Sequence, residues 1–222
     1  MSDSVESSAS APSDRARVRR VPKRAVYERE TVAAILDAAR VSHLGTVRDG
    51  APVVVPMLHA RVGDLVYLHG SSASVSVRGL RDGLPACLTA TLIDGLVLAR
   101  SAFHHSANYR SVVVHGSAVL VEDPDEKLAA LEAFTEKVLP GRWREVRPPN
   151  PLELKATAVL ALPLEESSAK VRDGDPVDDE EDYELDCWAG VVPLETIVGT
   201  PVPDARLRPG TPLSQAVSRL AG

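Results

Sequence analysis

The segment from His69 to Ser74 carries groups that favour phosphate binding. Its sequence, His-Gly-Ser-Ser-Ala-Ser, follows a run of strand-forming residues and opens a short helical stretch that contains Arg78 and Arg81. Hydroxyl groups, free backbone amides and a helix N-terminus in one turn suit a phosphate dianion, which an arginine one turn later can neutralise. The spacing predicts an anion site. The competing interpretation makes Ser74 a helix N-cap and Arg78 a solvated side chain.

A second polar block, residues 103–111, lies between two apolar runs. It ends in four side chains with hydrogen-bonding groups: Asn108, Tyr109, Arg110 and Ser111. Such groups recognise heteroaromatic rings or phosphates, although a hydrogen-bonded strand crossing with one exposed arginine would contain the same residues. His104 and His105 point to opposite faces of an extended chain, so this block does not indicate a metal site.

Other catalytic signatures are missing from the sequence. It contains no Gly-x-Ser-x-Gly nucleophile elbow, Walker loop or dinucleotide fingerprint, so hydrolase and nucleotide triphosphatase functions have no support. His43, His59 and His115 lie in apolar, strand-like runs. Structural histidines are common in such runs, and we assign these three no role.

Composition narrows the class of protein further. The chain has 222 residues, 44% of them hydrophobic, and a formal charge of −6. It can therefore bury a substantial core, but it lacks the basic field of a general nucleic-acid binder. Two cysteines are too few for a disulfide framework, and neither a signal core nor a membrane-length apolar run occurs. We expect a cytoplasmic protein without a membrane partner, and we rank nucleic-acid contact through the basic N-terminal residues last.

Hydrophobic periodicity predicts a helix followed by mostly β structure. Apolar residues recur at helical spacing from Tyr27 to Ala39, and an N-cap, a proline and an apolar stripe predict a second helix from Asp123 to Val138. The predicted strands are residues 41–47, 53–60, 65–69, 86–92, 96–102, 111–121 and 156–162. We expect Asp94-Gly95 to be a hairpin turn, and Pro56 to lie at an edge or a bulge. Tight hairpins without βαβ alternation predict a mainly β fold, an antiparallel barrel of about six strands with flanking helices.

Composition also divides the chain. Residues 1–24 are predicted to form a flexible arm with a basic second half, residues 25–205 the folded domain, and residues 206–222 a tail. Residues 165–184 hold ten acidic side chains against two basic ones. We expect a solvated loop or flap there, or a surface that receives the basic arm of a neighbouring subunit.

Beyond these local patterns, an ordered set of segments resembles the pyridoxamine 5′-phosphate oxidase-like flavoproteins with an FMN-binding split barrel. The likeness is strongest to the subgroup called flavin-nucleotide-binding or nitroimidazole-resistance-like proteins. The segments are residues 24–27, 49–56, 67–74, 94–101, 108–114 and 188–191. The likeness extends from Arg19 to about Asp204, and several long matches in order are more specific than any single motif.

The resemblance implies a homodimer with two FMN sites at the subunit interface. Members pass electrons through the flavin between a reduced nicotinamide or other donor and an acceptor. In the family, a strand lies along the isoalloxazine ring, a turn holds the ribityl and phosphate groups, and a histidine that matches His69 is associated with activity. The residues that the resemblance and the spacing place at the cofactor are Val54, Val55, Pro56, Met57, His69, Ser71, Ser72, Ser74, Arg78, Asn108, Tyr109, Arg110 and Ser111.

Two positions depart from the family. Val75 stands where relatives usually carry a basic residue, and Met57 where they often carry threonine. Loss of one charged hydrogen bond to phosphate would weaken FMN binding by about ten- to a hundredfold unless Arg78 or Arg81 replaces it.

The sequence therefore supports two hypotheses. The first is an FMN-dependent oxidoreductase that acts on a small organic substrate, with Arg110 or a backbone amide as the electrostatic partner of the flavin. The second is a non-catalytic protein on the same barrel that stores or senses a flavin or a haem, with His69 or His104 as the haem ligand. The deazaflavin F420 is an alternative to FMN under either hypothesis.

Overall fold

The computed structural model describes residues 10–72 and 85–221. The helices are α1 (Arg29–Ala38), α3 (Pro124–Val138), α4 (Pro151–Ala156) and α5 (Gln215–Ala221), with 3₁₀ turns η1 (Pro22–Arg24), η2 (Trp143–Glu145) and η3 (Glu180–Glu184). The strands are β1 (Ala25–Val26), β2 (Val41–Arg48), β3 (Ala51–Val62), β4 (Leu65–Ser71), β5 (Pro85–Leu98), β6 (Ser106–Ser117), β7 (Val119–Leu120), β8 (Thr157–Pro163), β9 (Glu166–Arg172) and β10 (Gly190–Pro193).

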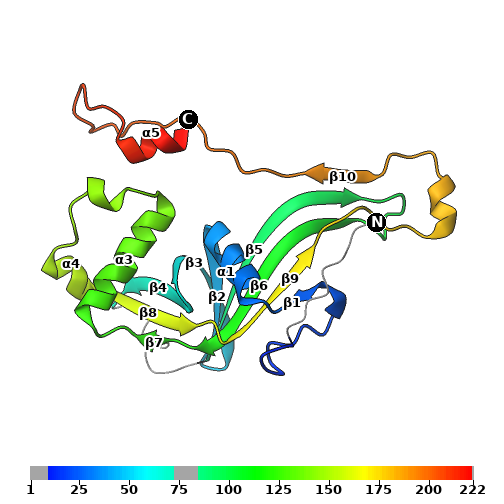
Figure 1. Ribbon diagram of the computed structural model, residues 1–222, viewed down its shortest axis with the longest axis horizontal. Helices are drawn as coiled ribbons and strands as arrows, with labels where there is room; N and C mark the ends of the chain where they lie inside the picture. The colour runs from blue at the N-terminus through cyan, green and yellow to red at the C-terminus, as the bar shows by residue number, and fades with distance from the viewer. Residues whose placement is uncertain (1–9, 73–84, 222) are drawn as a thin grey trace.

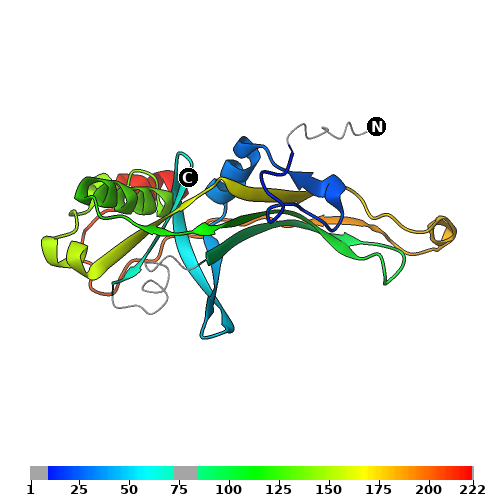
Figure 2. The same ribbon diagram turned by 90° about the horizontal axis from the view of Figure 1, so that it is seen from below.

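The strands form one antiparallel sheet in the order β1-β9-β6-β5-β2-β3-β4-β8-β7, and β10 adds to β5. The sheet is curved, and the long strands β5, β6 and β9 extend away from the half of the molecule that carries α3 and α4 (Figures 1 and 2). This arrangement confirms the predicted mainly β, antiparallel split barrel with flanking helices. The part of the chain that the structure describes has ten strands rather than about six.

The larger of two cores lies between α1 and the sheet. Val32, Ile35 and Leu36 of α1 recur at helical spacing and pack against buried side chains of the sheet. The largest fully buried side chains of this core include Leu36, Leu68, Leu88, Leu160 and Leu162. Burial of each leucine contributes about 1.5–3 kcal/mol, so this aliphatic cluster fixes α1 to the sheet.

The smaller core joins α3 to β3, β4 and β8. Asp123 begins the helix as predicted, because its carboxylate accepts hydrogen bonds from the amides of Asp125 at 2.9 Å and Glu126 at 2.8 Å. The helix then buries Ala130 and Phe134 against these strands. This packing places the second half of α3 next to β3 and β4.

The predicted hairpin turn at Asp94-Gly95 is wrong. β5 continues through these residues and pairs with β6 on both sides of a register shift between Ile93 and Gly95. The extra residue forms a β-bulge. A Cβ on Gly95 would lie 3.0 Å from Val191 Cγ1 and 3.2 Å from the Val192 carbonyl oxygen, so the glycine allows the close approach of β10.

The predicted loop at residues 165–184 is wrong in its first part. Residues 166–172 form β9, which lies between β6 and β1. Ser167, Ser168 and Ala169 are buried there. These small side chains fit a closely packed strand, whereas most of the acidic residues follow from Asp173 onward.

The basic arm is packed along much of its described part. Ala16 is 2% exposed, the Val18 amide donates a hydrogen bond to the Tyr27 hydroxyl at 3.0 Å, and Arg15 forms an ion pair with Glu166. The arm then continues through η1 into β1, which pairs with β9. These residues are therefore not a free arm, because a buried alanine and an acid of the same chain hold them.

The chain beyond β9 turns back at η3, runs along β5 as β10, and ends in α5 near α3 (Figure 1). α5 is held at η2, because the Ala216 amide donates to Glu145 Oε1 at 2.8 Å and Arg142 Nη1 donates to Ser214 Oγ at 3.1 Å. The predicted tail of residues 206–222 thus contains a helix that packs on the domain.

Asp178 fastens this returning segment to the end of β5. Its fully buried carboxylate accepts hydrogen bonds from the Arg100 amide at 2.9 and 3.1 Å, the Ser101 amide at 3.2 Å and the Arg100 guanidinium at 3.2 Å. Burial alone would raise the pKa of Asp178, but these hydrogen bonds outweigh it and the pKa is lowered. Asp178 therefore stays ionised and bonded at neutral pH.

We expect Asp178→Ala to make residues 173–193 about tenfold more sensitive to limited proteolysis, because the segment loses its charged hydrogen bonds to β5. Asp179→Ala is the matched control, since it removes only an exposed contact with His104. The cleavage rate of Asp179→Ala should stay close to that of the unmodified chain. Equal cleavage of the two variants would show that Asp178 does not hold the segment.

Candidate functional site

His69 extends from β4 to meet α3. On the sheet it pairs with Val159 of β8, and its ring lies edge-on to Phe134 with the centroids 4.4 Å apart. No residue within the described part of the chain forms a hydrogen bond with its ring nitrogens. Burial lowers the pKa of His69, so the imidazole is neutral at pH 7 and can act as a ligand or a base.

A cavity of about 530 Å³ opens beside His69. Its other lining residues come from α3, η2 and the chain that leads through α4 into β8: Leu131, Phe134, Thr135, Trp143, Val146, Arg147, Pro149, Glu153 and Thr157. The volume lies in the range of small-molecule and cofactor sites. The walls are largely apolar, with Arg147 and Glu153 as the charged lining residues.

The wall that carries Trp143 is held by the end of α3. Glu136 accepts hydrogen bonds from the amide of Gly141 at 2.6 Å and from the amide of Trp143 at 2.9 Å. These two bonds lower the pKa of Glu136, which stays ionised. Gly141 has a φ of +87°, a conformation that favours glycine, and it turns the chain from α3 into η2.

An ion pair lies at the rim of the cavity. Arg147 donates to both carboxylate oxygens of Glu153, at 2.6 and 2.8 Å. This pair and a hydrogen bond from the Asn150 amide lower the pKa of Glu153 to about 2. The charges of Arg147 and Glu153 are thus paired with each other at the wall of a largely apolar cavity.

The predicted ring-binding strand lies on β3. Val54 is 64% exposed and Pro56 is exposed, while Val55 and Met57 are half-buried. This part of β3 pairs with β2, whereas its pairing with β4 begins only at His59. Among the described residues, the side of β3 away from β2 is unpaired at Pro56, so Pro56 lies at a strand edge, as predicted.

The predicted phosphate turn is described only at its beginning. Ser71 is the last residue of β4 and Ser72 follows it; both are exposed, and the Ser72 amide donates to the carbonyl of Ala156 at 2.9 Å. Ser74 and Arg78, together with Val75 and Arg81, lie outside the described residues. The structure thus brings Ser71 and Ser72 close to His69 along one strand.

The predicted block on β6 is separate from His69 within the protomer, because β5, β2 and β3 lie between β6 and β4 in the sheet. Protein groups already bind most of its side chains. Asn108 accepts a hydrogen bond from Arg172 and donates to the Gly174 carbonyl at 3.1 Å. Arg110 is held by Asp94 at 2.6 and 2.9 Å.

Ser111, at the end of the same block, donates to the carbonyl of Lys170 on β9 at 3.3 Å. Tyr109 is half-buried and pairs with Ile93 and Arg172 on the neighbouring strands. The block therefore fits the alternative reading of a hydrogen-bonded strand crossing within one protomer.

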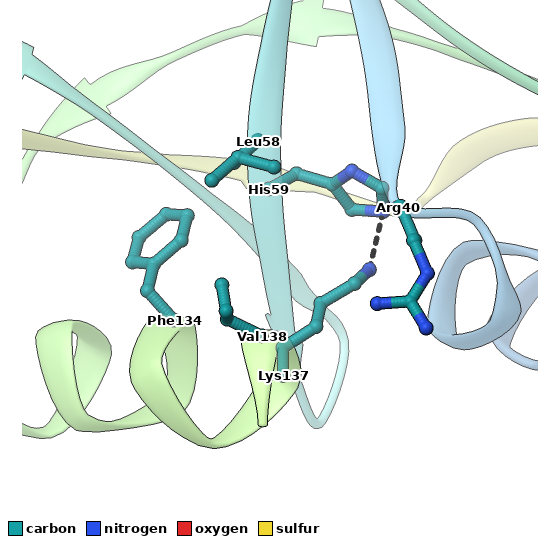
Figure 3. A pocket seen from close by; sticks show the side chains of 6 residues that line it. All are labelled: Arg40, Leu58, His59, Phe134, Lys137 and Val138. Carbon is teal, nitrogen blue, oxygen red and sulfur yellow. Dashed lines mark hydrogen bonds between the residues drawn. The ribbon is translucent and has the colours of Figure 1, made fainter. Parts of the chain in front are cut away.

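His59 and Lys137 form a buried pair to which sequence analysis assigned no function (Figure 3). Lys137 Nζ lies 2.6 Å from the Leu36 carbonyl oxygen and 2.8 Å from His59 Nε2. His59 is 1% exposed, and its Nδ1 has no partner among the described residues. One signal in the sequence could have indicated this pair. Lys137 lies three residues after Phe134 on α3, which places it near the buried face of the helix.

Burial and the neighbouring Lys137 lower the pKa of His59 to about 4, whereas its ordinary value is 6.5. Between these values the unfolded chain binds more protons than the folded one, so the free energy of unfolding rises with pH across this window. The His59 contribution is on the order of 3 kcal/mol.

Urea unfolding of the unmodified chain and of His59→Gln, at about pH 4 and about pH 7, measures this contribution. We expect the free-energy difference between the two proteins to change across the window. His43→Gln, at an exposed position of β2, should show a constant difference. A constant difference for His59→Gln as well would contradict the buried neutral state of His59.

The structure also bears on metal binding and on membrane insertion. Within residues 10–72 and 85–221, no group of three or more His, Cys, Asp or Glu side chains has the geometry to hold a metal ion. None of the helices in these two ranges combines the length and apolarity that a membrane crossing requires.

The chain matches one protein family in sequence and several solved structures in fold. The sequence model of the pyridoxamine 5′-phosphate oxidase family matches residues 28–171. The structure of flavocytochrome Anf3 from Azotobacter vinelandii is 44% identical, with a TM-score of 0.90, over 96% of this chain and 100% of that chain. The FAD and heme binding protein from Mycobacterium smegmatis is 38% identical, with a TM-score of 0.86, over 90% of this chain and 98% of that chain.

A more distant structure shares the fold alone. It is a nitroimidazole-resistance-like protein from Bacteroides thetaiotaomicron, which is 22% identical with a TM-score of 0.56 over 66% of this chain and 86% of that chain. A search of curated proteins gave no match.

Proposed function

This chain is a member of the pyridoxamine 5′-phosphate oxidase family, and we propose that it is a redox protein that binds a flavin and a haem. The observation that carries this proposal is the neutral imidazole of His69 at a largely apolar cavity of about 530 Å³. The two most similar structures described above are a flavocytochrome and a protein that binds FAD and heme, which supports the same pair of cofactors here.

The residues around the cavity fit a haem. Iron requires a neutral imidazole, and His69 provides one that no described residue engages by a hydrogen bond. Leu131, Phe134 and Trp143 would exclude water from the haem. A bound haem would supply one-electron chemistry at its iron. His104, the other ligand considered, is instead bonded to Asp179 at 3.3 Å.

The free edge of β3 fits a flavin ring. Residues 54–57 present apolar side chains there, and Ser71 and Ser72 lie at the end of β4 for the ribityl and phosphate groups. We favour FAD over the FMN expected from the sequence. FMN ends in a phosphate that concentrates two negative charges on one group, whereas each internal phosphate of FAD carries one, and the adenine of FAD adds contacts. The absence of a cation at Val75 is therefore easier to reconcile with FAD.

An exposed apolar surface supports the expected homodimer with the flavin at its interface. Val47, Val54, Leu58, Ile93 and Leu96 are all exposed on adjoining strands β2, β3 and β5. Clusters of large exposed apolar side chains mark interaction surfaces. A second copy of the chain and the flavin ring would together cover this surface.

The expected activity is electron transfer from a reduced donor to a small organic substrate. Storage or sensing is the second candidate, and the substitutions Met57 and Val75 favour it because they remove polar groups that family members offer the flavin. Cys87 and Cys187 are free thiols, which supports the reducing cytoplasm as the compartment. Steady turnover with a reduced nicotinamide separates the two functions, since a storage protein binds its cofactors without turnover.

Reconstitution of the purified full-length chain tests the proposal. We expect ferric haem and FAD each to saturate a single site per chain, with FAD bound more tightly than FMN or F420. Tighter binding of FMN or F420 would overturn only the choice of FAD as the flavin and would leave the rest of the proposal in place. A chain that takes up neither haem nor any flavin would overturn the proposed function.

A further inference from the structure

A second cavity, of about 180 Å³, shares Phe134 in its lining with the cavity beside His69. It lies where the end of α1, β3 and the C-terminal half of α3 meet (Figure 3). Its lining residues are Arg40, Leu58, His59, Phe134, Lys137 and Val138. The volume equals that of about six water molecules in the liquid, which is enough for a compact organic molecule.

The charged groups of this cavity are cations. Lys137 donates one ammonium proton to the Leu36 carbonyl at 2.6 Å and lies 2.8 Å from His59 Nε2, which leaves at least one of its three protons for a ligand. Arg40 is exposed and has no hydrogen bond or ion pair within the described residues. Asp37, the acid that raises the pKa of Lys137, is held by Arg61 at 2.6 and 2.9 Å. Among residues 10–72 and 85–221, no acidic side chain lines the cavity.

His59 helps to fix the position of the ammonium. Its Nε2 lies 2.9 Å from the Leu36 carbonyl oxygen and 2.8 Å from Lys137 Nζ, so the imidazole, the ammonium and this carbonyl form one polar cluster. Nδ1 of His59 is buried and has no partner among the described residues. The cluster holds Lys137 at the wall of the cavity, beside the space that a ligand would fill.

We propose that Arg40 and Lys137 bind a carboxylate, and that Leu58, Phe134 and Val138 hold the compact apolar body attached to it. Two cations opposite one carboxylate leave that anion well compensated, and the apolar side chains exclude charged or highly hydrated molecules.

Two sources supply this chemistry. One is a free monocarboxylic acid with a small ring or branched chain. The other is a carboxylate arm of a haem in the His69 cavity, because Phe134 lines both cavities. Only the second source rests on the proposed function.

The charge state of Lys137 predicts how binding depends on pH. Burial lowers the pKa of Lys137 to about 8, with Arg61 acting in the same direction and Asp37 in the opposite one. His59, with a pKa of about 4, is neutral across this range. Carboxylate binding should therefore weaken as pH rises above about 8, since Lys137 then loses its proton.

Calorimetric titration of the haem-free, full-length chain with benzoate tests the first source. We expect saturable binding that weakens by about tenfold or more in Lys137→Gln and in Arg40→Gln. Arg48→Gln, at another exposed arginine at the end of β2, should bind benzoate as the unmodified chain does. Neutral benzamide should bind much more weakly. Arg40→Gln keeps the test valid if Lys137→Gln fails to fold, because Arg40 is exposed.

Comparison of haem with its dimethyl ester tests the second source. If the haem arm is the occupant, haem binds more tightly than the ester in the unmodified chain, and Arg40→Gln removes that difference. The proposal is overturned if benzoate does not bind and haem and its ester bind equally, or if benzoate binds equally to the unmodified chain and both variants. If the chain binds no haem, the haem part of the proposed function fails and the benzoate titration alone tests the carboxylate site. Absence of benzoate binding then overturns that site.

Discussion

His69→Ala is expected to weaken haem binding by about a hundredfold or more, because the substitution removes the imidazole that faces the cavity. The described aromatic contact of His69 is one edge-on contact with Phe134, in which the ring centroids lie 4.4 Å apart, so the fold should tolerate the change. Haem titration followed by absorbance measures the loss. Thermal unfolding of the cofactor-free variant measures the effect on stability.

Addition of free imidazole to His69→Ala should restore haem binding, because the small molecule fits the space that the side chain leaves. This rescue separates loss of a ligand from general damage to the cavity. His104→Ala is the matched control, since His104 is bonded to Asp179 and does not line the cavity. Full haem binding by His69→Ala together with loss in His104→Ala would move the ligand to the other histidine.

Val54→Glu is expected to separate the proposed dimer and to release the flavin. Val54 is 64% exposed at the free edge of β3, where we place both the second copy and the isoalloxazine ring. Burial of an unpaired carboxylate in an interface costs several kcal/mol, so the dissociation constant of the dimer should rise by about a hundredfold or more. Sedimentation across a range of protein concentrations measures the dimer, and bound FAD is measured in the same samples.

The matched control is Val119→Glu on β7, where the valine is 63% exposed. β7 is the last strand of the sheet and is separated from β3 by β4 and β8. This variant should remain dimeric and keep its flavin. Haem binding at His69 should survive in both variants if the cavity belongs to one protomer. A dimeric, flavin-bound Val54→Glu protein would contradict the placement of the interface along β3.

Local signals were sufficient for much of the fold. The cap at Asp123 and the apolar stripe of α3 are contained in one short stretch of sequence, and the hairpins of β2, β3 and β4 have turn residues between them. These elements agree with their predictions because the interactions that define them are close in the sequence.

Long-range pairing explains the errors. Asp94-Gly95 has the composition of a hairpin turn, but its glycine is needed for the approach of β10 and its aspartate pairs with Arg110 on β6. β9 carries acids at its start and small polar residues within, so its burial between β6 and β1 has no periodic signal.

The site, like the fold, was predictable where its signal is local in the sequence and not where it depends on long-range contacts. His69 was identified from the composition of its turn and from the family resemblance, whereas its cavity is built by α3, η2 and α4, which follow much later in the chain. Lys137 and His59 meet only because α3 folds back onto β3. Conversely, Asn108 and Arg110 offer suitable ligand groups in sequence, yet Arg172 and Asp94 bind them in the fold.

We propose that a flavin and a haem occupy one molecule in positions that allow electrons to pass between them. Anaerobic illumination of the doubly loaded protein with EDTA reduces the flavin, while the absorbance of the haem is recorded at several protein concentrations. We expect the haem to become ferrous as the flavin is reduced, with a rate constant that does not depend on protein concentration. A reduced flavin beside a haem that stays ferric, or a rate that rises in proportion to protein concentration, would contradict the claim.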